Sequence, residues 1–340
     1  MTPSETERAN PVLVRLRRGS SVESFHRGSW VVVDRTGAVV ASSGDVDAPV
    51  FARSSIKALQ ALPLVESGAA DRFGFTPADL ALAISSHNGE SRHTEGATAI
   101  LARLGLDASA LRCGAQAPTD PEAKRRLRER DAKPGAIHNN CSGKHAGFLA
   151  LGAHLGADPK SYLDERAPVQ RAVRAAIAEM CSLDPATLET AIDGCSAPTF
   201  RLPLRAMALA FARLAEPSGL AATRRAAAVR LLDAAAEHPA MVAGEYKRLD
   251  TALLRVTNGR VFPKVGAEAV YVIAARDRGL GLALKIDDGA QRAMHAAVVA
   301  LCDRFQLVDR RALDELRDFG PGPLRNWAGL EVGSTDVELA

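Results

Sequence analysis

The strand-like segments of this chain lie near its two ends, and a long alanine-rich stretch with helical periodicity separates them. Residues 30–40 predict a β-hairpin, because two β-branched runs flank a short polar turn that contains Gly37. Much later in the chain, residues 269–274 and 281–286 flank a turn at 276–279, which predicts a second hairpin. One sheet can include both hairpins only if the two termini come together. The sequence therefore predicts an antiparallel sheet built from both termini, with helices packed on it.

Helical patterns fill the region between the two hairpins. A helix is expected directly after the first hairpin, where Ser54 and Ser55 are suitable N-terminal residues and apolar side chains from Ile56 to Leu64 recur at helical spacing. Alanine, the best helix former, is abundant between Thr76 and Leu254. Further helices are expected at 94–104, 204–214 and 221–236, and a final helix after the second hairpin at 290–305.

These patterns indicate one α/β domain of the α+β kind with two lobes, spanning residues 11–335. The sheet lobe is expected to comprise about 11–70 and about 256–335, and a mainly helical middle lobe about 71–255. Residues 1–10 are polar and are expected to form a flexible N-terminus.

Charge and composition exclude several classes of partner. Lysine plus arginine number 43 and aspartate plus glutamate 40, and because the two signs are interspersed, the net charge of +3 provides no strong field for nucleic acid or a membrane. Aromatic residues make up only 4% of the chain, which leaves few stacking platforms for bases. The basic run at 124–133 is interpreted as a solvated helix face. The N-terminus lacks a secretory signal and no long apolar stretch occurs, so we expect a cytoplasmic protein.

Three short motifs together indicate a serine hydrolase. Ser54 and Lys57 lie three positions apart, which on a helix places them on one face. A serine hydroxyl is a weak nucleophile and needs an adjacent base, a role that a lysine with a lowered pKa can fill. Serine hydrolases with Ser-x-x-Lys also carry Ser-x-Asn and Lys-x-Gly elements, which here are matched by Ser86 to Asn88 and by Lys264 to Gly266.

The chain has five cysteines, an odd number scattered along the sequence, which does not predict a disulfide framework. Two of them lie close in sequence to other residues of types that bind metals. On spacing alone, Cys141, His145 and Cys195 are candidate ligands for zinc. The other cysteines are expected to pack in the core; they are Cys113, Cys181 and Cys302.

At this level of detail the sequence resembles the Rhizobium etli type (class 3) L-asparaginases, whose fold is similar to that of serine β-lactamases and penicillin-binding proteins. The resemblance extends from about Pro11 to about Gly333. Its motifs are Arg53-Ser-Ser-Ile-Lys57, Ser86-His-Asn-Gly-Glu90, His138-Asn-Asn-Cys-Ser-Gly-Lys-His145, Asp193-Gly-Cys-Ser-Ala-Pro198, Lys264-Val-Gly-Ala-Glu268 and Lys285-Ile-Asp-Asp-Gly289. It implies hydrolysis of L-asparagine to L-aspartate and ammonia, by a homodimer.

The resemblance also implies the composition of the site. It implies two Ser–Lys pairs, Ser54 with Lys57 and Ser86 with Lys264, that meet in one cleft. It also implies that the third zinc ligand is a lysine and not His145, so that the expected ligands are Cys141, Lys144 and Cys195. The metal is expected to tune substrate affinity and not to be required for the chemical step.

Asparagine carries an α-carboxylate and an α-ammonium group, so its site needs one fixed cation and one fixed anion. Arg53 is expected to bind the carboxylate and Asp193 the ammonium group; the alternative, that either residue belongs to a structural ion pair, stays open. Asn88, His145 and Gly266 are the other expected substrate contacts, with backbone N–H groups near Ser54 and Gly266 as an oxyanion hole.

The expected mechanism is a two-step displacement. Lys57 takes the proton of Ser54, which attacks the amide carbon, and water then hydrolyses the acyl-enzyme, while Ser86 and Lys264 relay protons to the leaving ammonia. The opposite assignment, with Ser86 as the nucleophile, stays open. Two other interpretations are a serine hydrolase acting on a larger acyl donor and a zinc-stabilised amino-acid-binding protein.

Overall fold

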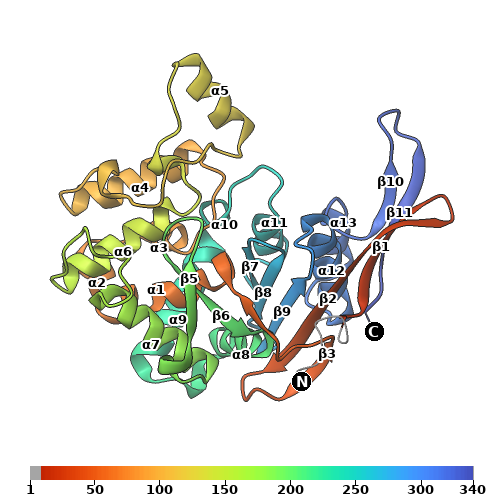
Figure 1. The fold of residues 1–340 in the computed structure, drawn as a ribbon, viewed down its shortest axis with the longest axis horizontal. Coiled ribbons are helices and arrows are strands. Elements are labelled where there is room, and N and C mark those ends of the chain that lie inside the picture. Colours follow the sequence, from red (N-terminus) through yellow and green to blue (C-terminus); the bar gives the residue numbers. More distant parts are fainter. Residues whose placement is uncertain (1–8, 340) are drawn as a thin grey trace, which may run out of the picture.

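The computed structural model describes residues 9–339, and at its centre is an antiparallel sheet of eight strands (Figure 1). The strands are β1 (Val12–Arg18), β2 (Ser21–Asp34), β3 (Val39–Ser43), β7 (Val261–Gly266), β8 (Val270–Ala275), β9 (Leu280–Ile286), β10 (Gly322–Arg325) and β11 (Glu331–Val337). Their order is β10-β11-β1-β2-β9-β8-β7, and β3 pairs with β2 beside this path. The predicted sheet built from both termini is therefore confirmed, with β2 pairing directly with β9.

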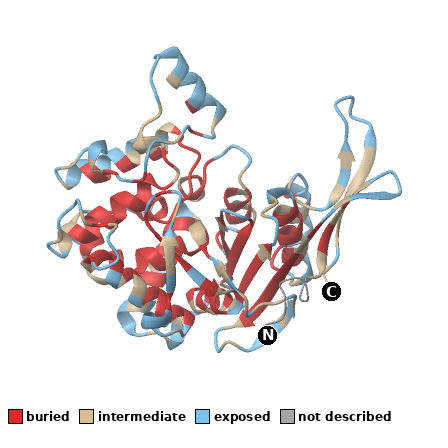
Figure 2. Cartoon of the chain, in the orientation of Figure 1, coloured by how far each residue is buried: buried red, intermediate tan, exposed pale blue. Residues whose placement is uncertain are grey.

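Strand β2 divides the hydrophobic interior because its alternate side chains point to opposite faces of the sheet. Val31 and Val33 belong to the core that contains α8 (Leu204–Ala215), whereas Trp30 and Val32 belong to the core that contains α12 (Gln291–Arg304). The central strands are consequently buried on both faces, as Figure 2 shows.

Most of the remaining helices lie between β3 and β7 in the sequence. They are α1 (Lys57–Glu66), α2 (Ala69–Arg72), α3 (Pro77–Ala83), α4 (Ser91–Arg103), α5 (Pro121–Glu129), α6 (Ser142–His154), α7 (Pro168–Cys181), α9 (Ala222–Glu237), α10 (Pro239–Val242), α11 (Leu249–Val256) and α13 (Arg310–Glu315). Helix α1 lies in the segment that the sequence analysis assigned to the sheet lobe, but it packs against α6, α7 and α9 of the helical lobe. The helices expected at 94–104, 204–214, 221–236 and 290–305 correspond to α4, α8, α9 and α12.

A second, three-stranded sheet takes two of its strands from the region that the sequence predicted as helical. Its order is β4 (Pro49–Phe51), β6 (Pro198–Pro203) and β5 (Glu189–Ile192). These strands are short, and β4 pairs with a strand far away in sequence, so no local pattern indicates them. This small sheet carries the chain from the large sheet to the start of α1.

The first part of the basic run that was predicted as a solvated helix face, residues 124–129, lies on α5. Arg125 and Arg126 are half exposed and both pair with Glu122, at 2.7 and 2.9 Å. Among the described residues, no helix is long and apolar enough to cross a membrane. Most of the predicted flexible N-terminus, residues 1–8, lies outside the described part of the chain.

Helix α8 lies directly on strand β9 at Gly281. A Cβ atom added there would lie 1.9 Å from the Ala208 carbonyl oxygen and 2.3 Å from the Ala212 nitrogen. Both contacts are with backbone, which cannot rotate away, so any side chain at this position forces the helix off the sheet.

We therefore expect Gly281→Ala to lower the free energy of unfolding by about 3 kcal/mol or more, as overpacking of a rigid core does. Urea unfolding followed by circular dichroism measures this change. Gly135→Ala is the matched control, because Gly135 has a negative φ and an added Cβ there meets nothing within 4 Å. Equal stability of the two variants would contradict the packing that we describe.

Candidate active site

Ser54 lies in a short 3₁₀ turn, Arg53–Ile56, that leads directly into α1. Strand β6 holds the start of this turn, since the Ala52 N–H donates to the Phe200 carbonyl at 2.9 Å and the Arg53 N–H to Thr199 Oγ1 at 3.1 Å. Arg53 has a φ of +51°, a left-handed conformation that is unusual for a side-chain-bearing residue and concentrates at functional sites. Ser54 itself is half buried.

Two buried lysines converge on one serine hydroxyl. Lys57 Nζ lies 3.0 Å and Lys264 Nζ 2.9 Å from Ser86 Oγ. Each amine also donates to a backbone carbonyl, Lys57 to Ser85 at 2.5 Å and Lys264 to Val265 at 2.9 Å. Lys57, Ser86 and Lys264 therefore form one continuous hydrogen-bonded chain across the junction of α1, the end of α3 and β7.

The expected hydrogen bond between Ser54 and Lys57 is not formed in this structure. Within residues 9–339 the Ser54 hydroxyl has no hydrogen-bond partner, while Lys57 Nζ is directed at Ser86. The structure thus brings Ser86 together with both lysines and places Ser54 one helical turn before Lys57, at the more exposed end of the cluster.

The environment of Lys264 favours a neutral amine. Burial lowers its pKa to about 7, and the charges of Lys57 and Arg248 add to this effect, whereas Asp250 and Cys141 oppose it. An amine with a pKa near neutrality can both accept and return a proton, which is the property that general acid–base catalysis requires.

Gly266 packs against the turn that carries Ser54. A Cβ at Gly266 would lie 2.9 Å from the Ala52 carbonyl oxygen and 3.2 Å from the Ser55 nitrogen. The end of β7 therefore approaches the Ser54 turn backbone to backbone, and a side chain at Gly266 would separate the two segments.

Arg53 and Asp193, which we expected to bind the two charged groups of an amino acid, form an ion pair with each other. Asp193 begins the tight turn between β5 and β6, where its N–H donates to the Ala197 carbonyl at 2.9 Å. Burial raises the pKa of the Asp193 carboxyl, but the Arg53 hydrogen bond and the Lys144 charge outweigh burial and hold it below its usual value.

The three predicted metal ligands lie together beside the Ser–Lys chain. Lys144 Nζ lies 3.2 Å from Cys195 Sγ, and the Cys141 and Cys195 thiols are within hydrogen-bonding reach of each other. Ligand atoms of a tetrahedral zinc are roughly 3.5 Å apart, so the spacing of the Lys144 amine and the Cys195 sulfur, with the Cys141 sulfur beside them, is compatible with the metal. Lys57 Nζ also lies 3.1 Å from Cys141 Sγ, which joins the two clusters.

Within the described residues, no group of three or more histidine, cysteine, aspartate or glutamate side chains has the arrangement of a metal site. The candidate site depends on its lysine. The Cys195 hydrogen bond, Lys57 and Lys144 lower the pKa of Cys141 despite its burial, and the same hydrogen bond raises that of Cys195. Burial lowers the pKa of Lys144, but the two thiols and Asp193 outweigh it, so a metal must displace a proton from this amine.

His145, a candidate for either metal or substrate, is fully buried beside the cluster. Its Nδ1 lies 2.8 Å from Tyr162 Oη, and its Nε2 has no hydrogen-bond partner among the described residues. Burial and the adjacent Lys144 charge hold the pKa of His145 well below its ordinary value, so its imidazole is neutral at pH 7.

Asn88, an expected substrate contact, has its side chain occupied by protein groups. Its amide donates to the Tyr246 carbonyl at 3.0 Å, and its oxygen accepts from Thr119 Oγ1 at 2.8 Å and Arg248 Nη1 at 2.9 Å. In this conformation Asn88 anchors the segment at 244–248 beside the residues that follow Ser86.

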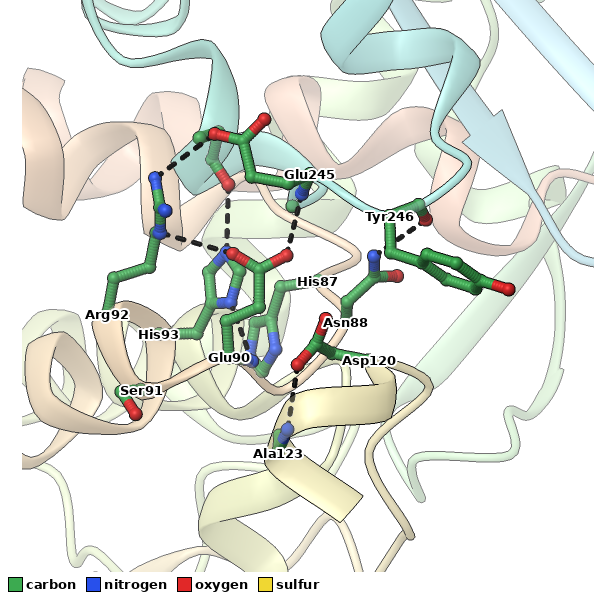
Figure 3. A network of polar contacts seen from close by, with 12 residues as sticks. His87, Asn88, Glu90, Ser91, Arg92, His93, Asp120, Ala123, Glu245 and Tyr246 are labelled. Atoms are coloured by element: carbon green, nitrogen blue, oxygen red, sulfur yellow. Dashed lines mark hydrogen bonds and ion pairs between the residues drawn. The ribbon is translucent and has the colours of Figure 1, made fainter. Parts of the chain in front are cut away.

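A pair of stacked histidines behind this segment is absent from the predicted site residues. The rings of His87 and His93 lie 4.6 Å apart and nearly parallel (Figure 3). His93 Nδ1 accepts from the Glu90 N–H at 3.1 Å, so its Nε2 carries the proton and donates to the Ala240 carbonyl at 2.8 Å. Such a ring has no place for a second proton.

Glu90 and Asp250 are two further polar residues, to which the sequence analysis assigned no individual role. Glu90 accepts from the Glu245 N–H at 2.6 Å and pairs with Arg92 at 3.1 Å (Figure 3). Asp250 is 2% exposed and accepts from the Val265 N–H at 2.8 Å. The contacts of Glu90 with Glu245 and of Asp250 with Val265 join separate segments of the chain, so the sequence pattern of either segment alone does not predict them.

A groove of about 660 Å³ elsewhere on the molecule is separate from this site. It lies between α3 and α9, and it is lined by Phe75, Pro77, Leu80, Ala222, Arg225, Ala226, Val229, Arg230, Asp233, Ala234 and Glu237. None of these residues belongs to the Ser–Lys chain or to the metal-ligand cluster.

Because His93 is buried in its neutral form, we expect the free energy of unfolding to fall as the pH is lowered. Burial lowers its pKa from 6.5 to about 4, so the unfolded chain binds this proton first as the pH falls. The resulting stability is fully present above about pH 6.5 and is lost as the pH falls toward 4, which amounts to about 3 kcal/mol. We expect urea unfolding between pH 7.5 and 4.5 to show a shallower pH dependence in His93→Gln, whereas His238→Gln, at a partly exposed position, keeps the wild-type slope.

A family model described as L-asparaginase II matches residues 14–337 of the chain. The comparison with curated proteins gave no match. Among solved structures, a β-lactamase from Mycobacterium bovis aligns at 13% identity with a TM-score of 0.44, covering 82% of this chain and 94% of that one. Mglu in its glutamate form aligns at 14% identity with a TM-score of 0.43, covering 83% of this chain and 61% of that one, so this chain spans less than two thirds of Mglu.

Proposed function

The chain belongs to the L-asparaginase II family, and we propose on this premise that it hydrolyses L-asparagine with a serine nucleophile in a double Ser–Lys site. Membership of this family makes the protein an L-asparaginase with asparagine as its substrate. The observation that carries the proposed mechanism is the chain of Lys57, Ser86 and Lys264, in which two amines share one hydroxyl at 3.0 and 2.9 Å.

Ser54 is the proposed nucleophile. It is the more exposed of the two serines, since Ser86 is only 4% exposed, and it follows directly after Arg53. The Ser54 hydroxyl transfers its proton to Lys57 as its oxygen attacks the amide carbon. Ser86 hydrogen-bonds both Lys57 and Lys264, so a proton taken up by Lys57 can pass through Ser86 to Lys264, which gives it to the leaving amide nitrogen in this proposal. Ammonia leaves, and water then hydrolyses the ester to L-aspartate and free Ser54.

Backbone N–H groups of the Ser54 turn and of Gly266 are the proposed oxyanion hole. The two segments lie backbone to backbone, which fixes such donors before negative charge develops on the amide oxygen. Arg53 binds the α-carboxylate of the substrate and Asp193 its α-ammonium group, so the zwitterion replaces an ion pair that the two residues make with each other.

Zinc is the proposed cofactor, held by Cys141, Lys144 and Cys195. When bound, it supplies a fixed positive charge next to Asp193 that tunes how tightly the substrate binds. The chain's own lysines and serines carry every proton, so the chemical step does not depend on the metal.

Two alternatives remain distinct from this proposal. If Ser86 is the nucleophile, both of its lysine contacts serve as bases and Ser54 assists. An amino-acid-binding protein without catalysis has no use for an amine whose pKa is lowered to about 7 beside a serine, which disfavours that interpretation.

We further propose that the protein is a homodimer in the cytoplasm. Light scattering of the purified protein tests the proposed dimer.

The two serines are distinguished by ammonia release from L-asparagine. We expect Ser54→Ala to lower kcat by about 10⁴-fold or more and Ser86→Ala by about 10²- to 10⁴-fold, since the first loses the nucleophile and the second a proton relay. Ser55→Ala is the matched control, because the Ser55 hydroxyl is buried and bonds only the Ala52 carbonyl, at 2.7 Å.

Mass spectrometry of acid-quenched enzyme shows which peptide carries the acyl group. An acyl group on Ser86, with substantial turnover in Ser54→Ala, reverses the assignment. No ammonia release by the wild type, with or without zinc, removes the proposed function altogether.

Removal of one metal ligand tests the role of zinc. We expect Cys195→Ala to lose bound zinc and to raise KM by roughly tenfold, equivalent to about 1.4 kcal/mol, with a smaller change in kcat. Cys302→Ala, at a buried thiol in the other core, retains the metal and the wild-type KM. Metal content is measured by elemental analysis beside the kinetics, and loss of kcat with an unchanged KM would contradict the proposed role.

A further inference from the structure

The strand that carries Lys264 lies at the edge of the sheet. Strand β7 ends the strand order and pairs with β8 on one side only. The outward N–H of Val265 would lack a partner there, but it donates to Asp250 Oδ1 at 2.8 Å. Asp250 lies in the first turn of α11, which packs along β7, and it is 2% exposed. A buried carboxylate therefore fixes the edge strand at the residue next to Lys264.

Arg248 connects this carboxylate with the segment that carries Ser86. Its Nη2 lies 3.7 Å from Asp250 Oδ2, and its Nη1 donates to Asn88 Oδ1 at 2.9 Å. Asn88 is two residues after Ser86, and backbone hydrogen bonds from Ser86 and Asn88 to residues 242 and 243 hold the same segment. Polar contacts therefore run from the Ser86 segment through Arg248 and Asp250 to the strand that bears Lys264.

We propose that Asp250 and Arg248 are positioning residues that hold Lys264 against Ser86 and set the charge around its amine. This inference rests on the proposed function, because it assigns these residues to the same Ser–Lys site. Neither side chain contacts Ser86 or the Lys264 amine through a hydrogen bond in the described residues, so both act through the strand and through their charge.

The groups that face Lys264 come from three directions. Lys57 lies on α1, Cys141 at the start of α6, and Arg248 and Asp250 at the start of α11. The two cations make protonation of Lys264 harder, whereas Asp250 and Cys141 make it easier. Beyond Asp250, Tyr271 of β8 and His295 of α12 also lie within the field of its carboxylate.

The Asp250 variant has an expected signature that loss of structure does not produce. Removal of the Asp250 charge should make Lys264 harder to protonate, and removal of the Arg248 charge should make it easier. A variant that merely loosened the site would admit water and move Lys264 toward its ordinary pKa of 10.5. A downward shift in Asp250→Asn therefore cannot come from loosening.

The experiment is an NMR titration of the full-length protein with isotope-labelled lysine, in which the Lys264 signal is assigned by its loss in Lys264→Arg. We expect the midpoint to fall by about one pH unit in Asp250→Asn and to rise by about one unit in Arg248→Gln. Asp79→Asn is the matched control, because Asp79 is also buried, caps a helix and pairs with an arginine, at 2.7 Å, but lies away from the site. Its midpoint stays at the wild-type value.

Kinetics add a second readout that does not depend on titration. We expect kcat for asparagine to fall by about 10²-fold in Asp250→Asn with little change in KM, since a misplaced amine affects proton transfer and not substrate binding. An unchanged or raised midpoint in Asp250→Asn overturns the proposal. If that variant does not fold, Asp250→Glu replaces it: a retained midpoint with a lowered kcat supports the proposal, and a wild-type kcat overturns it. Wild-type protein that releases no ammonia but shows the expected midpoints removes the proposed function alone.

Discussion

Burial of two lysine amines against a single serine hydroxyl is the constraint on which the rest of this site depends. An amine removed from water must keep its hydrogen bonds or lose its charge, because an unpaired buried ammonium group is very costly. Lys57 and Lys264 meet this condition by sharing Ser86 and by bonding the Ser85 and Val265 carbonyls. These partners come from α1, the end of α3 and β7, so the helical lobe and the large sheet must meet closely at this point.

The metal-ligand cluster and the Ser–Lys chain form one electrostatic unit. Lys57 lies within 3.1 Å of Cys141 Sγ as well as 3.0 Å from Ser86 Oγ, so a change of charge at the sulfur acts directly on the amine. Asp193 couples the cluster to Arg53 in the same way. The Ser–Lys chain and the metal-ligand cluster, which separate sequence motifs suggested, therefore form one buried polar cluster.

Local patterns predicted both hairpins and the longer helices α1, α4, α8, α9 and α12, because periodicity of two or of about 3.6 is visible within a single element. They did not predict the small sheet, whose β4 and β6 pair across a long separation in sequence. The motifs located Lys57, Ser86 and Lys264, but the expected contact of Lys57 with Ser54 is replaced by one with Ser86. Side-chain direction depends on the surrounding lobe, and contacts such as Glu90 with Glu245 or Asp250 with Val265 have no local signal.

The pairing of β2 with β9 has a consequence for how the protein is made. The large sheet joins strands from the first and last parts of the chain, and such long-range contacts make folding slow. During synthesis on the ribosome, β1 and β2 emerge long before their partners β9 and β11 exist. The apolar faces of β1 and β2 therefore stay uncovered until the C-terminal strands have been made, which exposes the nascent chain to aggregation.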